Sequence, residues 1–160
     1  MKRYLLDTSA LLTPRDDEPG AARVSEVLQQ AAKGKARCYG CIMSLMEGLY
    51  RVWRDKTEAS SRLAYQQCLE LPLEWVRDSD ALLIKAAEMK ALYSLSLADG
   101  WVAACTLEQG ATLIHKDPEF HALPLEQEAL PVKNQKIERE IICWPGLCRF
   151  YCNKGAISRP

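Results

Sequence analysis

Residues 96–117, SLADGWVAACTLEQGATLIHKD, decide the fold of this chain. The segment that begins at Ser96 has the pattern of a helix and stops at the glycine in position 110, a residue that commonly ends helices. Ala111 to Ile114 follows as a short apolar run typical of a buried strand, and it leads to Asp117. A helix joined by a short turn to a buried strand predicts an α/β fold.

The same alternation extends back toward the N-terminus. Short apolar runs predict strands at residues 3–6, 36–42 and 73–76. Helical periodicity predicts helices over residues 24–33, 46–53, 58–70 and 80–93, the last of them capped by Ser79. In the helix over 58–70, Leu63 and Leu69 are expected to face inward. This order of elements predicts a three-layer sandwich, with a central, mostly parallel sheet of four to five strands and helices on both faces.

One predicted helix carries an apolar stripe. The stripe repeats at positions i, i+3, i+4 and i+7 and consists of Met46, Leu49, Tyr50 and Trp53. This spacing places the four side chains on one face of a helix. The sequence leaves open whether Tyr50 and Trp53, and the face from Leu82 to Tyr93 on a later helix, belong to the core or to an interface.

The composition is that of one ordinary globular domain. The chain has 160 residues, 48% of them hydrophobic and 26% charged, and its formal net charge is zero. A neutral chain has no global basic field, so binding of a polyanion would depend on a local patch or on a metal ion. Asp7 interrupts the N-terminal apolar run early, and no apolar run is long enough to span a membrane. We therefore expect a cytoplasmic protein with no membrane partner.

Seven cysteines raise the question of a zinc site. Cys38 and Cys41 have Cys-x-x-Cys spacing, and Cys143, Cys148 and Cys152 lie close together near the C-terminus. Structural zinc sites usually combine two such pairs, and the sequence contains no second Cys-x-x-Cys. We expect reduced thiols that pack as small apolar residues.

Four acidic residues carry the chemistry of this sequence. Each lies at the end of a predicted strand or in the first turn of a predicted helix: Asp7, Glu47, Asp99 and Asp117. In a parallel α/β sheet these points gather along one edge, which is where ligands bind. Carboxylates that are brought together ionise together only beside a positive charge, so we expect a divalent metal ion held by oxygen ligands.

Each acid also has a structural explanation. Two have the spacing of a capping box with an earlier serine: Ser44 with Glu47, and Ser96 with Asp99. Asp7 could cap the first helix, and Asp117 could open a turn before Pro118. Capping accounts for each acid separately. It does not account for the position of all four where an α/β sheet collects its ligands.

The motifs around these acids resemble those of the PIN-domain family, and most closely the VapC-like toxin ribonucleases of VapBC toxin–antitoxin systems. Three motifs match in order and spacing: LLDTSAL at 5–11, SLMEGLYR at 44–51, and LSLADGWVAA at 95–104 continued by GATLIHKDPEF at 110–120. The resemblance covers about residues 3–125. It implies a PIN-like nuclease domain at 1–125, followed by a C-terminal extension at 126–160 that packs on the same domain.

The resemblance also implies the site residues. Mg²⁺ or Mn²⁺ would be held by Asp7, Glu47, Asp99 and Asp117, with Ser9 and Glu119 in support. His115 stands where the family usually has serine or threonine. We expect it to face solvent, with a metal or phosphate contact as the alternative. Arg51 and Arg54 follow Glu47 at i+4 and i+7 and are expected to contact RNA phosphates, the alternative being a solvated helix face.

The implied activity is the hydrolysis of single-stranded RNA, with a cognate antitoxin and a second copy of the chain as partners. A haloacid dehalogenase-type phosphatase would need a second aspartate where this chain has Ser9. A receiver domain would need a paired acid and a late lysine, which the motifs around Glu47 and Asp99 do not supply. A catalytically silent PIN module that binds RNA or protein, or a PIN nuclease of RNA processing, remains as an alternative.

Overall fold

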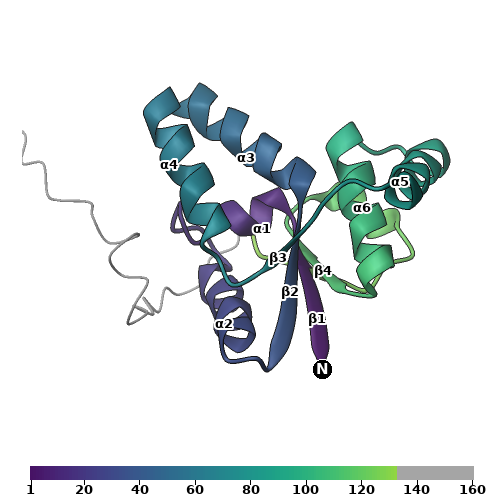
Figure 1. Ribbon diagram of the computed structural model, residues 1–160, viewed down its shortest axis with the longest axis horizontal. Coiled ribbons are helices and arrows are strands. Elements are labelled where there is room, and N and C mark those ends of the chain that lie inside the picture. The colour runs from purple at the N-terminus through teal and green to yellow at the C-terminus, as the bar shows by residue number, and fades with distance from the viewer. Residues whose placement is uncertain (133–160) are drawn as a thin grey trace, which may run out of the picture.

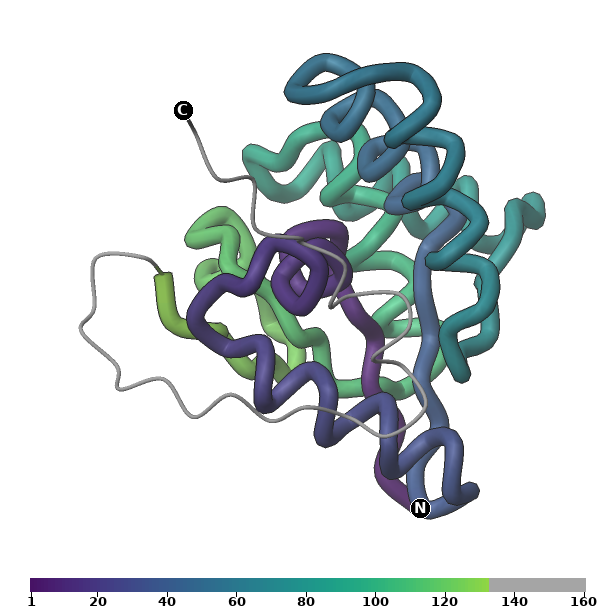
Figure 2. Tube along the Cα trace, turned by 90° about the vertical axis from the view of Figure 1, so that its left-hand side faces the viewer, coloured from purple at the N-terminus to yellow at the C-terminus, as the bar shows by residue number. Residues whose placement is uncertain are grey.

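The computed structural model describes residues 1–132, which form a parallel sheet between layers of helices (Figure 1). Its five strands are β1 (Lys2–Leu6), β2 (Ala36–Cys41), β3 (Glu74–Val76), β4 (Thr112–His115) and β5 (Gln127–Ala129). Their order is β3-β2-β1-β4-β5, and every neighbouring pair is parallel. Figure 2 shows β1 and β2 running side by side from the N-terminal end of the molecule. The predicted α/β sandwich is confirmed.

Helices fill the connections between the strands. They are α1 (Thr8–Leu12), α2 (Ala21–Ala32), α3 (Ile42–Asp55), α4 (Glu58–Leu69), α5 (Asp80–Leu92) and α6 (Leu97–Gln109), and a 3-10 turn, η1 (Pro118–Ala122), follows β4. The predicted cap of α5 is confirmed, because the Ser79 side chain accepts a hydrogen bond from Leu82 N. Gly110 ends α6 in the left-handed conformation, as predicted. No helix in this part of the chain is long and apolar enough to cross a lipid bilayer.

The sheet is buried on both faces. Leu5 of β1 packs into a cluster with residues of α5 and α6, such as Leu82 and Val102. Its neighbours Tyr4 and Leu6 belong to a second cluster, which includes Val24 and other residues of α1 and α2. Successive side chains of a strand point to opposite faces, so the alternation in β1 produces these two layers. The predicted three-layer arrangement follows from it.

The helices α3 and α4 lie side by side beyond the carboxyl edge of the sheet (Figure 1). The prediction that Leu63 and Leu69 face inward is wrong, because both are exposed, by 54% and 43%. Instead α4 buries Ser61 and Ala64, and the Ser61 hydroxyl donates a hydrogen bond to the Leu49 carbonyl of α3 at 2.8 Å. Small residues at this contact let the two helices approach closely.

The sheet continues past residue 125, because β5 pairs with β4. Leu130, just after β5, is buried in the cluster that contains Val24. The boundary at 125 remains a prediction. The charged segment 133–140 and the three C-terminal cysteines lie outside the described residues. The cysteines of residues 1–132, among them Cys38 and Cys41, are free thiols.

One glycine in the sheet should be essential for stability. A Cβ atom added at Gly40 would lie 2.6 Å from Cζ3 of Trp75 on the neighbouring strand β3. We expect Gly40→Ala to lower the free energy of unfolding by roughly 1–3 kcal/mol, because the indole must shift. Gly48→Ala in α3 is the matched control, since its Cβ would meet nothing within 4 Å. The control should stabilise the helix by up to about 1 kcal/mol. Urea denaturation measures both, and equal effects would contradict the expectation.

Candidate metal-binding and nuclease site

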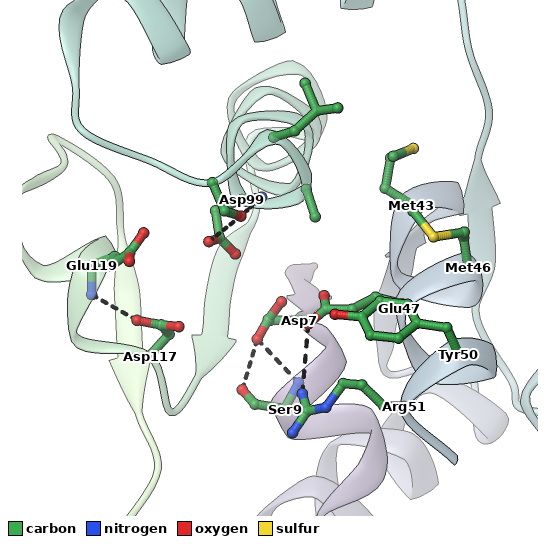
Figure 3. A pocket seen from close by; sticks show the side chains of 13 residues that line it. Asp7, Ser9, Met43, Met46, Glu47, Tyr50, Arg51, Asp99, Asp117 and Glu119 are labelled. Carbon is green, nitrogen blue, oxygen red and sulfur yellow. Dashed lines mark hydrogen bonds and ion pairs between the residues drawn. The ribbon is translucent and has the colours of Figure 1, made fainter. Parts of the chain in front are cut away.

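The carboxyl edge of the sheet holds a cleft of about 430 Å³ (Figure 3). Asp7 directly follows β1, Asp117 follows β4, Glu47 lies on α3 after β2, and Asp99 lies in the first turn of α6. All four line the cleft, together with Ser9, Arg51 and Glu119. Figure 3 shows Asp7 between Asp99, Asp117 and Glu119 on one side and Glu47 on the other. The structure therefore brings the predicted acids together.

Asp7 is fixed at the start of α1. It is the N-cap of this helix, and its Oδ2 accepts hydrogen bonds from the amide and the hydroxyl of Ser9, at 3.1 and 2.7 Å. Its Oδ1 is buried and has no hydrogen-bond partner among the described residues. Burial raises the pKa of Asp7 to about 6, and the charge of Glu47 acts in the same direction. A buried carboxylate with one free oxygen is a suitable ligand for a cation.

Asp99 is held by the serine that the capping-box spacing indicates. Ser96 is the N-cap of α6, its hydroxyl donates to Asp99 Oδ2 at 2.6 Å, and it accepts from Asp99 N at 3.1 Å. Burial raises the pKa of Asp99, and the charges of Asp117, Glu47 and Glu119 raise it further. The neighbouring carboxylates therefore disfavour the charge of Asp99, an effect that a cation placed among them would offset.

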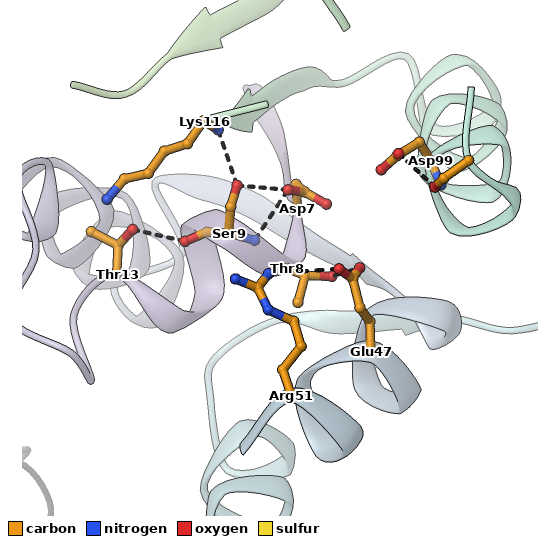
Figure 4. Close-up of polar contacts among 9 residues, drawn as sticks. Asp7, Thr8, Ser9, Thr13, Glu47, Arg51, Asp99 and Lys116 are labelled. Carbon is orange, nitrogen blue, oxygen red and sulfur yellow. Dashed lines mark hydrogen bonds and ion pairs between the residues drawn. The ribbon is translucent and has the colours of Figure 1, made fainter. Parts of the chain in front are cut away.

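Glu47 does not pair with Ser44, but it does pair with Arg51 at i+4, which the sequence spacing also allows. Cys41 is the N-cap of α3, and Ser44 is buried within the helix, so the predicted capping box at Ser44 is wrong. Instead the Thr8 hydroxyl donates to Glu47 Oε2 at 2.7 Å, and Arg51 Nη1 lies 3.6 Å from Oε1 (Figure 4). Sequence reasoning missed Thr8. The only signal was its position directly after Asp7.

The Ser9 hydroxyl connects the end of β1 with the end of β4 through two hydrogen bonds (Figure 4). It donates to Asp7 and accepts from Lys116 N at 3.0 Å, and Lys116 follows β4. The Lys116 ammonium group forms an ion pair with Glu18 at 2.8 Å. The predicted supporting position of Ser9 thus has a physical basis, because this hydroxyl orients Asp7 relative to β4.

Asp117 and Glu119 form the outer wall of the cleft. Asp117 is the N-cap of η1, and its Oδ1 accepts from Glu119 N at 2.9 Å, so it also opens the turn before Pro118. Capping and cleft lining therefore occur together in Asp7 and Asp117, whereas α6 is capped by Ser96 and Asp99 lies three residues after that cap. The structural explanation and the chemical one are not exclusive.

The two predicted arginines have different positions. Arg51 lines the cleft beside Glu47. Arg54 lies one turn farther along α3, where it is exposed and pairs with Asp55 at 3.0 Å. It does not line the cleft.

His115 does not face solvent, and this prediction is wrong. The side chain is fully buried, its Nε2 lies 3.1 Å from Gln127 Oε1, and its ring contacts Phe120 edge-on. The ring lies against Phe120 and His121 of η1 and against Gln127 of β5, so both of these elements contribute to its burial. Burial lowers the pKa of His115, which favours the neutral ring.

The donor set of the cleft fits a hard divalent cation. Its side-chain donors are mainly carboxylate oxygens, the ligands that Mg²⁺ and Mn²⁺ prefer. Within residues 1–132, no three carboxylate, histidine or cysteine side chains already converge as a closed metal site. Mg²⁺ commonly retains several waters and needs only one or two carboxylates. The buried Oδ1 of Asp7, which has no hydrogen-bond partner among the described residues, is an oxygen available to such an ion.

Loss of the Thr8 hydroxyl should weaken the site without unfolding the protein. We expect Thr8→Val to lower RNA cleavage by roughly 10- to 100-fold, because a hydrogen bond to a charged group is worth about 1.5–3 kcal/mol and Glu47 would lose its orientation. Thr8→Ser should restore most of the activity. The rate of cleavage and the far-ultraviolet circular dichroism of both variants measure the effect, and equal loss in the two variants would show that the hydroxyl is not the cause.

The fold and the acidic cleft define an α/β protein with several carboxylates at the carboxyl edge of its sheet. Residues 4–125 match the PIN domain family, and this match covers most of the chain. This chain therefore belongs to the PIN domain family. No curated protein matches it in sequence.

Solved structures with the same fold include VapC toxins of VapBC toxin–antitoxin systems. VapBC2 from Rickettsia felis, bound to a promoter DNA fragment, has a TM-score of 0.65 and 18% identity, over 81% of this chain and 99% of that one. VapBC from Salmonella typhimurium, bound to DNA, has a TM-score of 0.64 and 17% identity, over 81% and 98%. VapC20 from Mycobacterium tuberculosis, a toxin that cleaves the sarcin-ricin loop, has a TM-score of 0.60 and 15% identity, over 76% and 95%. At these identities the likeness shows a shared fold.

Proposed function

We propose that this chain is a metal-dependent endoribonuclease that hydrolyses single-stranded RNA in the cytoplasm, as the toxin of a toxin–antitoxin pair. The observation that supports this most is the convergence of Asp7, Glu47, Asp99 and Asp117 in one cleft. Membership of the PIN domain family and the fold shared with VapC toxins support the same assignment.

The residues of the cleft would have different roles in the reaction. Asp7 and Asp99 are the proposed main ligands of Mg²⁺ or Mn²⁺, because both line the cleft from buried positions, where a cation would offset the cost of their charge. Glu47 and Asp117 would complete the site, directly or through water. A divalent ion supplies an acidified water and neutralises charge on the phosphodiester. Ser9 would keep Asp7 oriented, and Glu119 would add negative charge at the rim.

The RNA backbone needs cations beside this acidic cleft. Arg51 lies in the cleft wall next to Glu47, so it is placed to contact a phosphate next to the scissile one. Arg54, exposed on the next turn of α3, would contact a phosphate farther along the strand. These contacts carry no sequence information, so they would hold RNA of any sequence.

The ends of the products test this mechanism. Attack by water should leave 5′-phosphate and 3′-hydroxyl ends, which accept an adapter by ligation without prior kinase treatment. Attack by the 2′-hydroxyl of the RNA itself would leave 2′,3′-cyclic phosphates and need no metal ion. Cyclic ends would contradict the proposal. RNA that is bound but never cut, with Mg²⁺ or Mn²⁺ present, would favour the silent PIN module.

Protein partners are part of the proposal. Several similar structures are toxin–antitoxin complexes, which supports an antitoxin partner for this chain.

A homodimer is supported by exposed apolar residues on α5, namely Leu83, Ile84 and Leu92. Light scattering should give the mass of two chains for the purified protein and of one chain for Ile84→Asp. A monomeric wild type at micromolar concentration would contradict the homodimer.

A further inference from the structure

We infer that the exposed face of α3 beside the cleft is a stacking platform for unpaired bases of the RNA strand. The platform consists of Met46, Tyr50 and Trp53. The inference rests on the proposed function, and it specifies how the same site would hold a single strand. The sequence left open whether Tyr50 and Trp53 belong to the core. Both side chains are exposed, so neither belongs to it.

The platform is open and adjoins the acidic cleft. Met46, Tyr50 and Trp53 occupy positions i, i+4 and i+7 of α3 and are exposed by 49%, 47% and 48%. The opposite face of α3 carries the contacts with the rest of the protein, including the buried Val52. Met46 and Tyr50 also line the cleft, and Figure 3 shows both near Glu47. The apolar, partly aromatic platform therefore lies directly beside the carboxylates of the cleft.

The chemistry of this face favours a nucleobase over an apolar protein segment. A basic residue follows each aromatic one along α3, Arg51 after Tyr50 and Arg54 after Trp53, and Arg51 lines the same cleft as Tyr50. Aromatic rings stack on bases of any sequence, while guanidinium groups contact phosphates and the faces of rings. A phosphate held through a cation at the carboxylates would have its neighbouring nucleotide within reach of Tyr50, because Tyr50 and Glu47 line the same cleft. Only an unpaired base can stack in this way, so the platform would select single strands.

Binding without cleavage provides the first test. In the Asp7→Asn background, the dissociation constant of a fluorescently labelled single-stranded RNA is measured by anisotropy. We expect Tyr50→Ala to weaken binding roughly 10-fold, within the range measured for loss of a base-stacking aromatic residue. Tyr50→Phe should bind like the parent, and Tyr50→Leu should bind as weakly as Tyr50→Ala. Tyr65→Ala is the matched control: Tyr65 is exposed on α4 outside the cleft, and its loss should have no effect.

An oligonucleotide with abasic positions separates base stacking from other causes. It keeps the phosphates, so Tyr50→Ala should leave its affinity unchanged. Equal weakening for abasic and normal strands, or parent-like binding by Tyr50→Leu, would overturn the inference. Wild-type cleavage together with unchanged RNA affinity in Tyr50→Ala would also overturn it, and the face would then be assigned to a protein partner. A wild type that neither binds nor cuts RNA would overturn the proposed function as well.

Discussion

Replacing Asp7 with asparagine is expected to lower RNA cleavage by roughly a thousand-fold, which corresponds to about 4 kcal/mol of activation free energy. Asparagine keeps the shape and the capping ability of aspartate but removes the charge that would hold the cation. The same substitution should stabilise the metal-free protein at neutral pH. Burial raises the pKa of Asp7 to about 6, so its ionised form is disfavoured in the folded state.

Cleavage and thermal unfolding of one preparation measure both effects. The matched control is Asp80→Asn, which changes an exposed aspartate in the first turn of α5, outside the cleft. The control should cut RNA like the wild type. An Asp7→Asn protein that cuts RNA at the wild-type rate would exclude Asp7 as a ligand. One that is inactive and also much less stable would point to structural damage.

The stability of the metal-free protein should fall as pH rises from about 4 to 6. Asp7 has its pKa raised from 3.8 to about 6, so the folded state holds a proton that the unfolded chain has already released. Above pH 6 this difference costs about 3 kcal/mol of the free energy of unfolding, whereas below pH 4 it costs nothing. Burial raises the pKa of Asp99 too, which acts in the same direction.

The difference between wild type and Asp7→Asn isolates this contribution from other titrating groups, such as His115. Denaturation from pH 4 to 7.5 with a chelator present should show a gap that opens with pH in favour of the variant. Added Mn²⁺ should close the gap at pH 7.5 and have less effect at pH 5, where the ion must displace a proton. A gap that does not depend on pH would contradict the assigned pKa. An absence of any effect of Mn²⁺ would contradict the assigned ligand.

Periodicity in the sequence was sufficient for most of the fold. Four strands and the helices α2 to α6 were predicted, because buried parallel strands are short apolar runs and the helices have a clear period, whereas the short helix α1 was not. The strand β5, Gln127–Ala129, could not be predicted, since it is short and has no apolar pattern. The error at His115 has the same origin, because the histidine is buried against Gln127 of β5 and the rings of η1, contacts that the sequence pattern did not indicate.

The acids of the cleft were predictable, and their contacts were not. Asp7 and Asp117 end strands and Asp99 begins a helix, so the topology alone placed them at one edge of the sheet. The bond from Thr8 to Glu47 spans 39 residues and depends on how α1 meets α3. The error at Leu63 has a similar origin. Periodicity shows that a helix has two faces, whereas the packing of α3 decides which of them is buried.

The most direct test of the central claim is the cleavage of a mixed pool of single-stranded RNA with Mn²⁺, Mg²⁺ or a chelator. The wild type would be compared with the double variant Asp7→Asn/Asp99→Asn, both shown to be folded and free of other proteins. We predict cutting by the wild type that requires a divalent ion and is lost in the double variant. Cutting that persists in the chelator or in the double variant would contradict the metal-dependent site. A complete absence of cutting with either ion would contradict the nuclease assignment itself.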